Sequence, residues 1–305
     1  MLMNLDRKFK LGMHSYTLHL NGCGQNWGFV GDYRDQKIDI FKLMDLAVGW
    51  QLDGLHITNV DLQSHEPEQL AKVKKAAEDH GLYLEFNCSL DEEFDPRLNE
   101  TFEDAAWVAE QIGAKVVKFS LDIRRPKPLY GSQFHPDVMR QLCDVVDKIK
   151  AALPEYERTG IRLAVENHTE TFADEIIWVV EQVGHPLCGA CLDNINSFSV
   201  LESPEYSDRV LAPYTYCVHF CDNILIRDQD GAHFKGVALG TGDVDCKKTL
   251  LQLQRAPECL DCINFEVEWE IGQDTLEVAQ EKELKACEES IKYLREELGL
   301  GLRGR

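Results

Sequence analysis

Four apolar runs in the second half of the sequence each carry an acidic residue or a histidine near their ends. The runs are Arg162–Asn167, Gly189–Asp193, Thr215–Phe220 and Cys262–Glu268, and the residues are Glu166, Asp193, His219 and Glu266. If the runs are parallel strands, these side chains gather where the carboxyl ends of the strands meet. Alternation within a strand supports this, because Leu163 and Val165 on one face leave Glu166 and His168 on the other.

Such a cluster of side chains favours a bound divalent metal. Burying three carboxylates together without a cation costs several kcal/mol per unpaired ion. Oxygen ligands with one imidazole suit Mn²⁺ best, with Mg²⁺, Co²⁺ or Zn²⁺ as alternatives. One acidic residue at a strand end is more often a helix cap or an ion-pair partner, but four in successive strands favour a metal site. Glu268 shares the inward face of its run with Glu266, so either is a candidate fourth ligand.

The elements that must position these residues are predicted by an alternation of strand and helix patterns. Four further apolar runs precede the first set: Leu11–Tyr16, Gly54–Asn59, Leu82–Asn87 and Val116–Leu121. Helical spacing of apolar residues lies in most of the gaps, over Ile40–Val48, Leu70–Ala77, Phe102–Ile112, Val138–Leu153, Asp174–Val183 and Leu250–Leu253, and a last charged helix covers Gln280–Leu298. Gly81, Gly113 and Gly184 each follow a helical segment, as helix-ending glycines do.

Eight strand–helix units in succession predict an α/β fold, a (β/α)8 TIM barrel that forms a single domain over residues 1–305. A doubly wound open sheet is the alternative. That fold usually has a glycine-rich phosphate loop after its first strand, and the segment HSYTLHLNGCGQNWGF has no such pattern.

Composition excludes several classes of partner. Lys plus Arg number 32 against 53 Asp plus Glu, which gives a formal charge of −21. So acidic a chain is expected to bind neither nucleic acid nor an anionic membrane surface. No stretch reaches the ~18 apolar residues of a membrane span and no secretory leader is evident, so we expect a cytoplasmic protein.

The eleven cysteines include three close pairs, Cys188/Cys191, Cys217/Cys221 and Cys259/Cys262. Each pair lies in or beside an apolar run, and a spacing of three within a strand puts the two sulfurs on opposite faces. A zinc ribbon needs its cysteines in tight turns instead. Buried free thiols are therefore the favoured interpretation of these pairs.

The set Glu166, Asp193, His219 and Glu266 resembles that of the xylose isomerase-like barrel superfamily, which includes ketose 3-epimerases, inosose isomerase and an apurinic-site endonuclease. The stretch Gly242–Leu253 (GDVDCKKTLLQL) is similar to one that the superfamily has before its last helix and strand. The resemblance implies that these four residues hold one metal at the ends of strands five to eight. It also implies an acid/base pair of Glu166 and Glu266 and a homo-oligomeric assembly, since such barrels are often dimers or tetramers.

The sequence departs from the superfamily pattern after two strands. Cys221 stands where many members have a lysine, directly before Asp222. Asn196 stands where many have a histidine three residues after the strand-six aspartate, which puts a second base there in doubt. The missing histidine and the negative charge argue against the endonuclease chemistry, and the complete ligand set argues against a barrel that serves only as a binding scaffold.

Two functions follow from this resemblance. The first is a metal-dependent sugar or polyol isomerase or epimerase that works through a metal-stabilised enediolate. His168 is a further base or hydroxyl-binding candidate. The alternative is a metal-dependent decarboxylase or lyase of an oxo sugar acid, for example of the 3-oxo-isoapionate type. It needs a cationic carboxylate clamp, for which Arg124 and Arg125, with Lys127, are candidates.

A small-molecule sugar or sugar acid is thus the expected partner, and other polar residues are candidates to bind it. Those expected to contact substrate are His14, His56, Asn87, Asn196 and Asp222, together with the two arginines. Trp27, Phe29 and Trp269 could cover an apolar sugar face, and His233 and Lys235 lie in the loop after strand seven.

Overall fold

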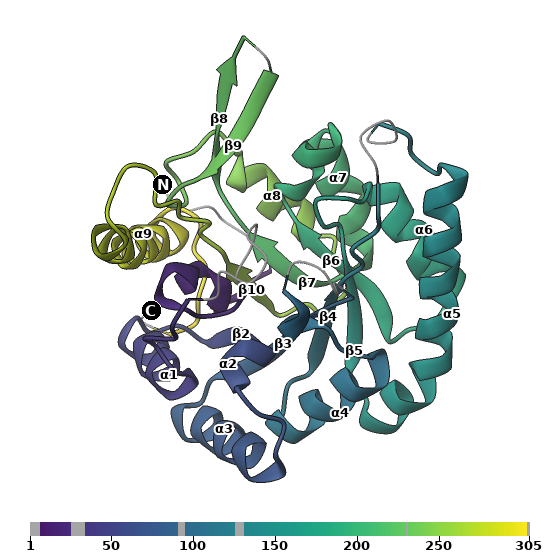
Figure 1. Cartoon of the computed structure of the whole chain (residues 1–305), viewed down its shortest axis with the longest axis horizontal. Helices are drawn as coiled ribbons and strands as arrows, with labels where there is room; N and C mark the ends of the chain where they lie inside the picture. Colours follow the sequence, from purple (N-terminus) through teal and green to yellow (C-terminus); the bar gives the residue numbers. More distant parts are fainter. Residues whose placement is uncertain (1–6, 26–33, 91–94, 126–130, 230, 304–305) are drawn as a thin grey trace.

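In the computed structural model, eight parallel strands form a closed barrel with helices around it (Figure 1). The strands in barrel order are β1 (Lys10–His14), β2 (Gly54–Thr58), β3 (Tyr83–Ser89), β4 (Val116–Ser120), β5 (Arg162–Glu166), β6 (Cys188–Asp193), β7 (Thr215–Phe220) and β10 (Cys262–Phe265). β1 pairs with both β2 and β10, which closes the sheet. The structure describes residues 7–25, 34–90, 95–125, 131–229 and 231–303. The predicted (β/α)8 fold is confirmed.

Nine α-helices in the described part of the chain surround the barrel, and the longer ones bury an apolar face against it. They are α1 (Ile40–Gly49), α2 (Asn59–Leu62), α3 (Pro67–His80), α4 (Phe102–Ile112), α5 (Pro136–Thr159), α6 (Ala173–Val183), α7 (Pro204–Leu211), α8 (Cys246–Leu253) and α9 (Leu276–Glu296). α4 is typical. Thr101 caps its first turn by accepting from the Asp104 amide, Phe102 and Ala109 are buried at helical spacing, and Gly113 ends it with a positive φ of 77°.

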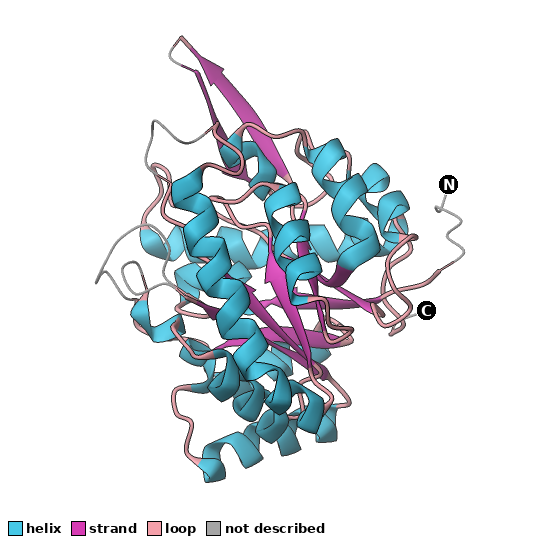
Figure 2. Cartoon of the chain, turned by 90° about the vertical axis from the view of Figure 1, so that its right-hand side faces the viewer, coloured by secondary structure: helices cyan, strands magenta, loops and turns pink. Residues whose placement is uncertain are grey.

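Two short helices, α2 and α7, and one hairpin were not predicted from the sequence. α7 buries Ser207 and Asp208 beside Leu211, so it shows little of the apolar period that marks a helix. The antiparallel strands β8 (Asn223–Asp228) and β9 (Gly231–Gly236) form a ribbon outside the barrel. Figures 1 and 2 show this ribbon projecting from the body of the molecule.

Alternation along the strands separates two apolar layers. Leu163 and Val165 belong to the large core between sheet and helices, whereas Ala164 packs with Val116, Cys191 and Cys217 in a small cluster inside the barrel. The rest of the interior is unusually polar, because the inward positions carry buried histidine, glutamate, lysine and asparagine. These residues are His14, His56, Glu85, Asn87, Lys118, Glu166, His219 and Asn264.

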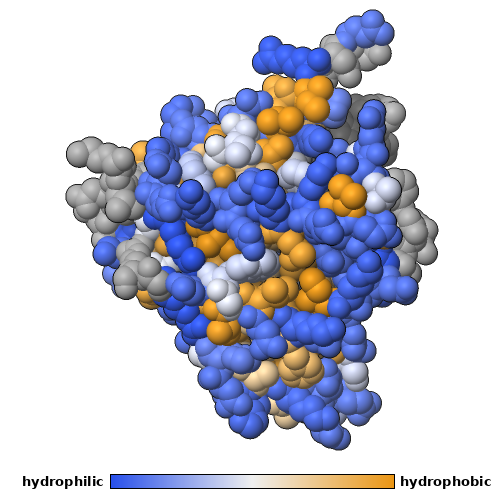
Figure 3. Space-filling model, turned by 90° about the vertical axis from the view of Figure 1, so that its left-hand side faces the viewer, coloured by the Kyte–Doolittle hydropathy of each residue, from blue (hydrophilic) through white to orange (hydrophobic). Residues whose placement is uncertain are grey.

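The surface of the molecule is mixed in hydropathy. On the face shown in Figure 3 hydrophilic side chains predominate, with apolar patches between them. Within the described part of the chain, no helix is long and apolar enough to span a membrane.

Candidate metal centre and active site

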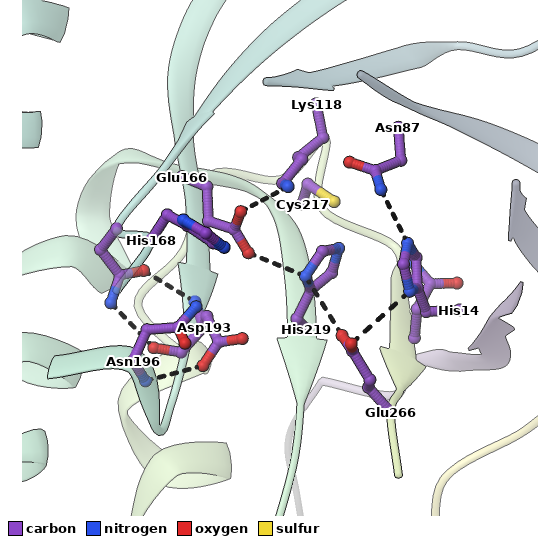
Figure 4. Close-up of polar contacts among 12 residues, drawn as sticks. His14, Asn87, Lys118, Glu166, His168, Asp193, Asn196, Cys217, His219 and Glu266 are labelled. Atoms are coloured by element: carbon purple, nitrogen blue, oxygen red, sulfur yellow. Dashed lines mark hydrogen bonds and ion pairs between the residues drawn. The ribbon is translucent and has the colours of Figure 1, made fainter. Parts of the chain in front are cut away.

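The four predicted ligands come together at the carboxyl ends of four neighbouring strands (Figure 4). His219 lies at the centre of the group. Its Nδ1 is 2.9 Å from Oε1 of Glu166 and 3.4 Å from Oε2 of Glu266. Glu166, Asp193 and His219 each present a ligand atom within 4.8 Å of the others. All four side chains are buried, so the group is shielded from bulk water.

Backbone and asparagine contacts fix the Asp193 carboxylate at the end of β6. Its Oδ1 accepts hydrogen bonds from the amides of Ile195 and Asn196, at 2.8 and 3.0 Å. Asn167, the residue after Glu166, braces the same point by donating to the Asp193 carbonyl and accepting from its amide, both at 2.8 Å. Asn194 makes the equivalent pair of bonds to Cys221 at the start of the next loop. Each asparagine thus fixes the register between its own strand end and the next.

The carboxylates repel one another electrostatically. Burial raises the pKa of Asp193 well above its usual value, and the charge of Glu166 adds to the effect. Burial and the charges of Glu268 and Asp193 raise the pKa of Glu266 in the same way. Like charges packed this closely favour a cation between them. The donor set is oxygen-rich with one imidazole, and it therefore fits a divalent metal.

Lys118 is a buried cation in this site that the sequence analysis missed. It points inward from β4, and its ammonium contacts Oε2 of Glu166 with both side chains at most 5% exposed. Burial alone would raise the pKa of Glu166, but the charges of Lys118 and His219 hold it well below its usual value. A lysine inside the apolar run VVKFS was the available signal, because a charge on a buried strand needs a partner.

His168 reaches the site from the loop after β5. Its Nδ1 lies 2.6 Å from Oε2 of Glu170. Burial lowers the pKa of His168, but the charges of Glu170 and Glu166 outweigh burial and raise it to about 10. An imidazole paired in this way favours its protonated form, in which it donates hydrogen bonds.

Two further histidines lie on the far side of His219. His56 Nδ1 is 3.3 Å from His219 Nε2, and His14 Nδ1 is 3.7 Å from Oε1 of Glu266. Asn87 donates to His14 Nε2 at 3.0 Å. Burial lowers the pKa values of His14 and His56 well below the usual value, so both rings are neutral.

The cluster lines a small cavity that shares residues with a larger one. The small cavity, about 30 Å³, is lined by the four ligands and by His14, Tyr16, Gln25, Asn87, Lys118, His168, Thr169, Asn196 and Glu268. The larger cavity, about 390 Å³, shares Tyr16, Thr169, Asn196 and Glu268 with it and adds Arg34 and Trp269. Its size is in the range of small-molecule binding pockets. Glu268 lines both, and Asn223 donates a hydrogen bond to it.

Four of the predicted substrate contacts do not line the cavity. His56 is fully buried beneath His219. Arg125 is buried against Glu175 at 2.5 Å and also donates to the carbonyls of Glu170 and Ser132, so it anchors loops. Arg124 is exposed, and its backbone amide donates to Gln141. Asp222 accepts from the amides of the loop segment 240–244 and holds that turn.

The remaining candidates are divided between the ribbon and undescribed segments. His233 and Lys235 lie on β9 of the projecting ribbon. Trp27, Phe29 and Lys127 lie outside the described residues.

Comparison with known proteins places this architecture in a family. Residues 41–297 match the family model described as a xylose isomerase-like TIM barrel. The chain belongs to this family. Among solved structures with a similar fold, a D-psicose 3-epimerase determined in the presence of D-fructose superposes with a TM-score of 0.66. The match covers 95% of this chain and 99% of that one, at 15% identity. The IOLI protein, with a bound zinc atom, gives a TM-score of 0.61 over 93% and 98%, also at 15% identity.

Two curated relatives have detectable sequence similarity to this member of the family. A 3-oxo-isoapionate decarboxylase of Pectobacterium atrosepticum is 27% identical over 128 residues, which span 41% of this chain and 46% of that enzyme. YihM of Escherichia coli is 21% identical over 248 residues, 80% of this chain and 68% of that protein. The decarboxylase match thus covers less than half of either chain.

Proposed function

We propose that this protein is a divalent-metal-dependent sugar or polyol isomerase or epimerase. The observation that carries the proposal is the convergence of Glu166, Asp193, His219 and Glu266 on one cavity, with His219 in contact with both glutamates. The similarity of fold to a D-psicose 3-epimerase, an enzyme that acts on a ketose, supports a sugar as the substrate. The adjoining cavity of about 390 Å³ has room for a monosaccharide.

The four residues would hold the metal, with Mn²⁺ the best match to the donor set. When bound, such a metal supplies Lewis acidity that polarises a substrate carbonyl and acidifies the neighbouring C–H. Asn167 and the amides of Ile195 and Asn196 keep Asp193 oriented for this role. Glu268 is an additional carboxylate at the same cavity, and it is the alternative fourth ligand.

The chain supplies an acid/base pair whose two members differ in proton affinity. Lys118 and His219 keep Glu166 ionised, so it can accept the substrate proton. Burial and neighbouring charges raise the pKa of Glu266 in the metal-free protein, which marks it as the carboxylate of higher proton affinity, and it would return a proton to the substrate from an oxygen that does not face the metal. Two carboxyl groups with pKa values pushed in opposite directions are a typical acid/base arrangement.

Other side chains at the cavity orient the substrate. His168, protonated by its contact with Glu170, donates to a hydroxyl or carbonyl oxygen. Oδ1 of Asn87 is buried and has no hydrogen-bond partner among the described residues, and a substrate hydroxyl that donates to it would satisfy it. His14 and Asn196 complete the polar lining.

A specific observation also favours a second function, decarboxylation of an oxo sugar acid. Lys118 is a buried cation at the same cavity, and it can bind a substrate carboxylate or the oxygen on which charge develops as carbon dioxide leaves. It replaces the Arg124/Arg125 clamp suggested by the sequence, which lies away from the cavity. The partial match to the 3-oxo-isoapionate decarboxylase points the same way.

Incubation of the Mn²⁺-loaded protein in deuterated water tests the two functions. Deuterium entering C2 or C3 of a ketose, without release of carbon dioxide, is the result expected for an isomerase or epimerase. Release of carbon dioxide from a 3-oxo sugar acid, without exchange on ketoses, would replace that proposal by the second one. Glu266→Gln should abolish either turnover.

The matched control is Asp208→Asn, which alters another buried carboxyl. Asp208 accepts from Thr249 at 2.5 Å on α8, and burial raises its pKa to about 7. It does not line the small cavity. Turnover that survives Glu266→Gln, or that falls equally in Asp208→Asn, would contradict the proposed roles.

A further inference from the structure

Each of the three cysteine pairs noted in the sequence sends at least one member into the barrel. Cys191 and Cys217 pack with Val116 and Ala164 inside it, whereas Cys188 belongs to the outer core. Cys262 points to the same interior, since its thiol donates to Oε1 of Glu85 at 3.2 Å. Three sulfurs from three strands therefore lie in one buried layer below His219, and none has a role in the proposed reaction.

Glu85 lies in the middle of this layer, with no lysine or arginine contact among the described residues. Asn264 donates to its Oε2 at 2.7 Å, and the Cys217 thiol donates to the same oxygen at 3.3 Å. Burial raises the pKa of Glu85 to about 7. His56, whose ring is also fully buried, completes the group with its Nδ1 at 3.6 Å from Oε2. A glutamate, a histidine and a cysteine are an unusual filling for a barrel interior, where branched apolar residues dominate.

The three atoms form a triangle of a size that a metal ion would require. Cys217 Sγ, His56 Nδ1 and Glu85 Oε2 are separated by 3.3, 3.6 and 3.7 Å. Tetrahedral zinc, with bonds of about 2.0 Å to oxygen or nitrogen and 2.3 Å to sulfur, holds its ligands about 3.3 to 3.6 Å apart. The circle through the three observed positions has a radius of about 2.0 Å, so one ion can reach all three atoms without moving them far.

We propose that Cys217, Glu85 and His56 form a second metal site in the floor of the barrel, distinct from the oxygen-rich centre above it. The thiolate selects a soft ion, Zn²⁺ in preference to Mn²⁺ or Mg²⁺. Binding displaces the thiol proton, and any proton on Glu85, to solvent. The fourth position lies on the side of His219, whose Nε2 is 3.3 Å from His56 Nδ1. The occupied site would therefore support His219 from below.

Cobalt replaces zinc in such sites and distinguishes the two centres by colour, because only the floor site has a sulfur ligand. All three ligands are buried, so the ion must enter as the barrel folds. The protein is therefore produced in minimal medium supplemented with Co²⁺. We expect two cobalt ions per chain and a thiolate-to-cobalt charge-transfer band in the near ultraviolet.

Variants assign the band to its ligands. Cys217→Ser and Glu85→Gln should each lose the band and one cobalt ion. Glu85→Gln retains the shape of the side chain, so it tests the site even if Cys217→Ser folds poorly. Cys188→Ser, which changes the outward cysteine of a neighbouring pair, should retain both. Asp193→Asn should lose the other cobalt and keep the band, so failure of the upper centre can be told apart from failure of this one.

Two results would overturn the floor site. One is a wild-type protein that contains cobalt but has no thiolate band, which would mean that the layer is held by hydrogen bonds alone. The other is a band that persists in folded Cys217→Ser or Glu85→Gln protein.

Discussion

Replacing Lys118 by methionine removes the only lysine or arginine contact of Glu166 among the described residues and keeps an unbranched side chain, one atom shorter. The pair is buried on both sides, at 5% and 2% exposure of the side chains. Without the ammonium, the imidazole of His219, 2.9 Å away, is the one remaining ion-pair contact of Glu166 among the described residues. A buried carboxylate that loses its cation must stay charged in a poorly hydrated site or take up a proton, and either change destabilises the folded state.

Removing one partner of a buried ion pair typically costs about 3–5 kcal/mol. We expect the lower end, about 3 kcal/mol, because the hydrogen bond of Glu166 to His219 remains. The pKa of Glu166 is depressed below its unfolded value of 4.5, and that of Lys118 is raised above 10.5, so the pair stabilises the fold throughout the range between these values. In the variant Glu166 can take up a proton, so the loss of stability shrinks as the pH falls from about 8 towards 5.

Urea unfolding of the metal-free protein measures this effect directly. Lys75→Met is the matched control, because Lys75 pairs with Asp79 on the exposed face of α3 and should change the free energy of unfolding very little. The double variant Lys118→Met/Glu166→Gln should recover part of the loss, since the remaining group is uncharged. Added Mn²⁺ should stabilise Lys118→Met more than wild type, because the metal provides the missing cation.

A Lys118→Met protein as stable as the Lys75→Met control at about pH 8 would refute this prediction. It would also be refuted if the loss grew on acidification, because a carboxylate deprived of its cation must be relieved by protonation.

Three further predictions rest on the same structure. Affinity for Mn²⁺, measured by titration, should fall steeply as the pH is lowered, because the raised pKa values of Asp193 and Glu266 mean that protons compete with the metal for both carboxylates; a pH-independent affinity would contradict this. Arg125→Gln should lower the free energy of unfolding by about 3 kcal/mol and leave metal content unchanged, since Arg125 pairs with buried Glu175 away from the cavity. A loss of metal without a loss of stability would instead make Arg125 part of the metal site. Asn167→Ala should weaken Mn²⁺ binding about 10- to 100-fold, as loss of an outer-shell partner usually does, with far-ultraviolet circular dichroism unchanged; unaltered affinity would show that Asp193 needs no such brace.

The fold could be predicted from the sequence because each strand–helix unit repeats a local pattern. Helix ends at Gly81, Gly113 and Gly184 were visible as residues, and all three adopt the left-handed conformation that ends a helix. α7 could not be predicted because its buried face carries Ser207 and Asp208. These two side chains accept hydrogen bonds from Asn167 and Thr249, and they add nothing to an apolar pattern.

The site was predictable where alternation and strand ends decide position, and less so where loops do. Glu166 and His219 follow from the register of the barrel, since inward residues at the ends of neighbouring strands must meet. Arg125 follows its strand in the sequence as a substrate ligand would, but the loop turns it towards Glu175. Lys118 lies two residues before the end of β4. We considered only polar residues at strand ends, so Lys118 was not among the candidates.

Metal analysis of purified Asp193→Asn beside Asp208→Asn tests the central claim most directly. We predict that Asp193→Asn loses one divalent ion per chain relative to wild type, with circular dichroism unchanged, whereas Asp208→Asn loses none. Equal metal content in the two variants would contradict a metal centre on Glu166, Asp193, His219 and Glu266.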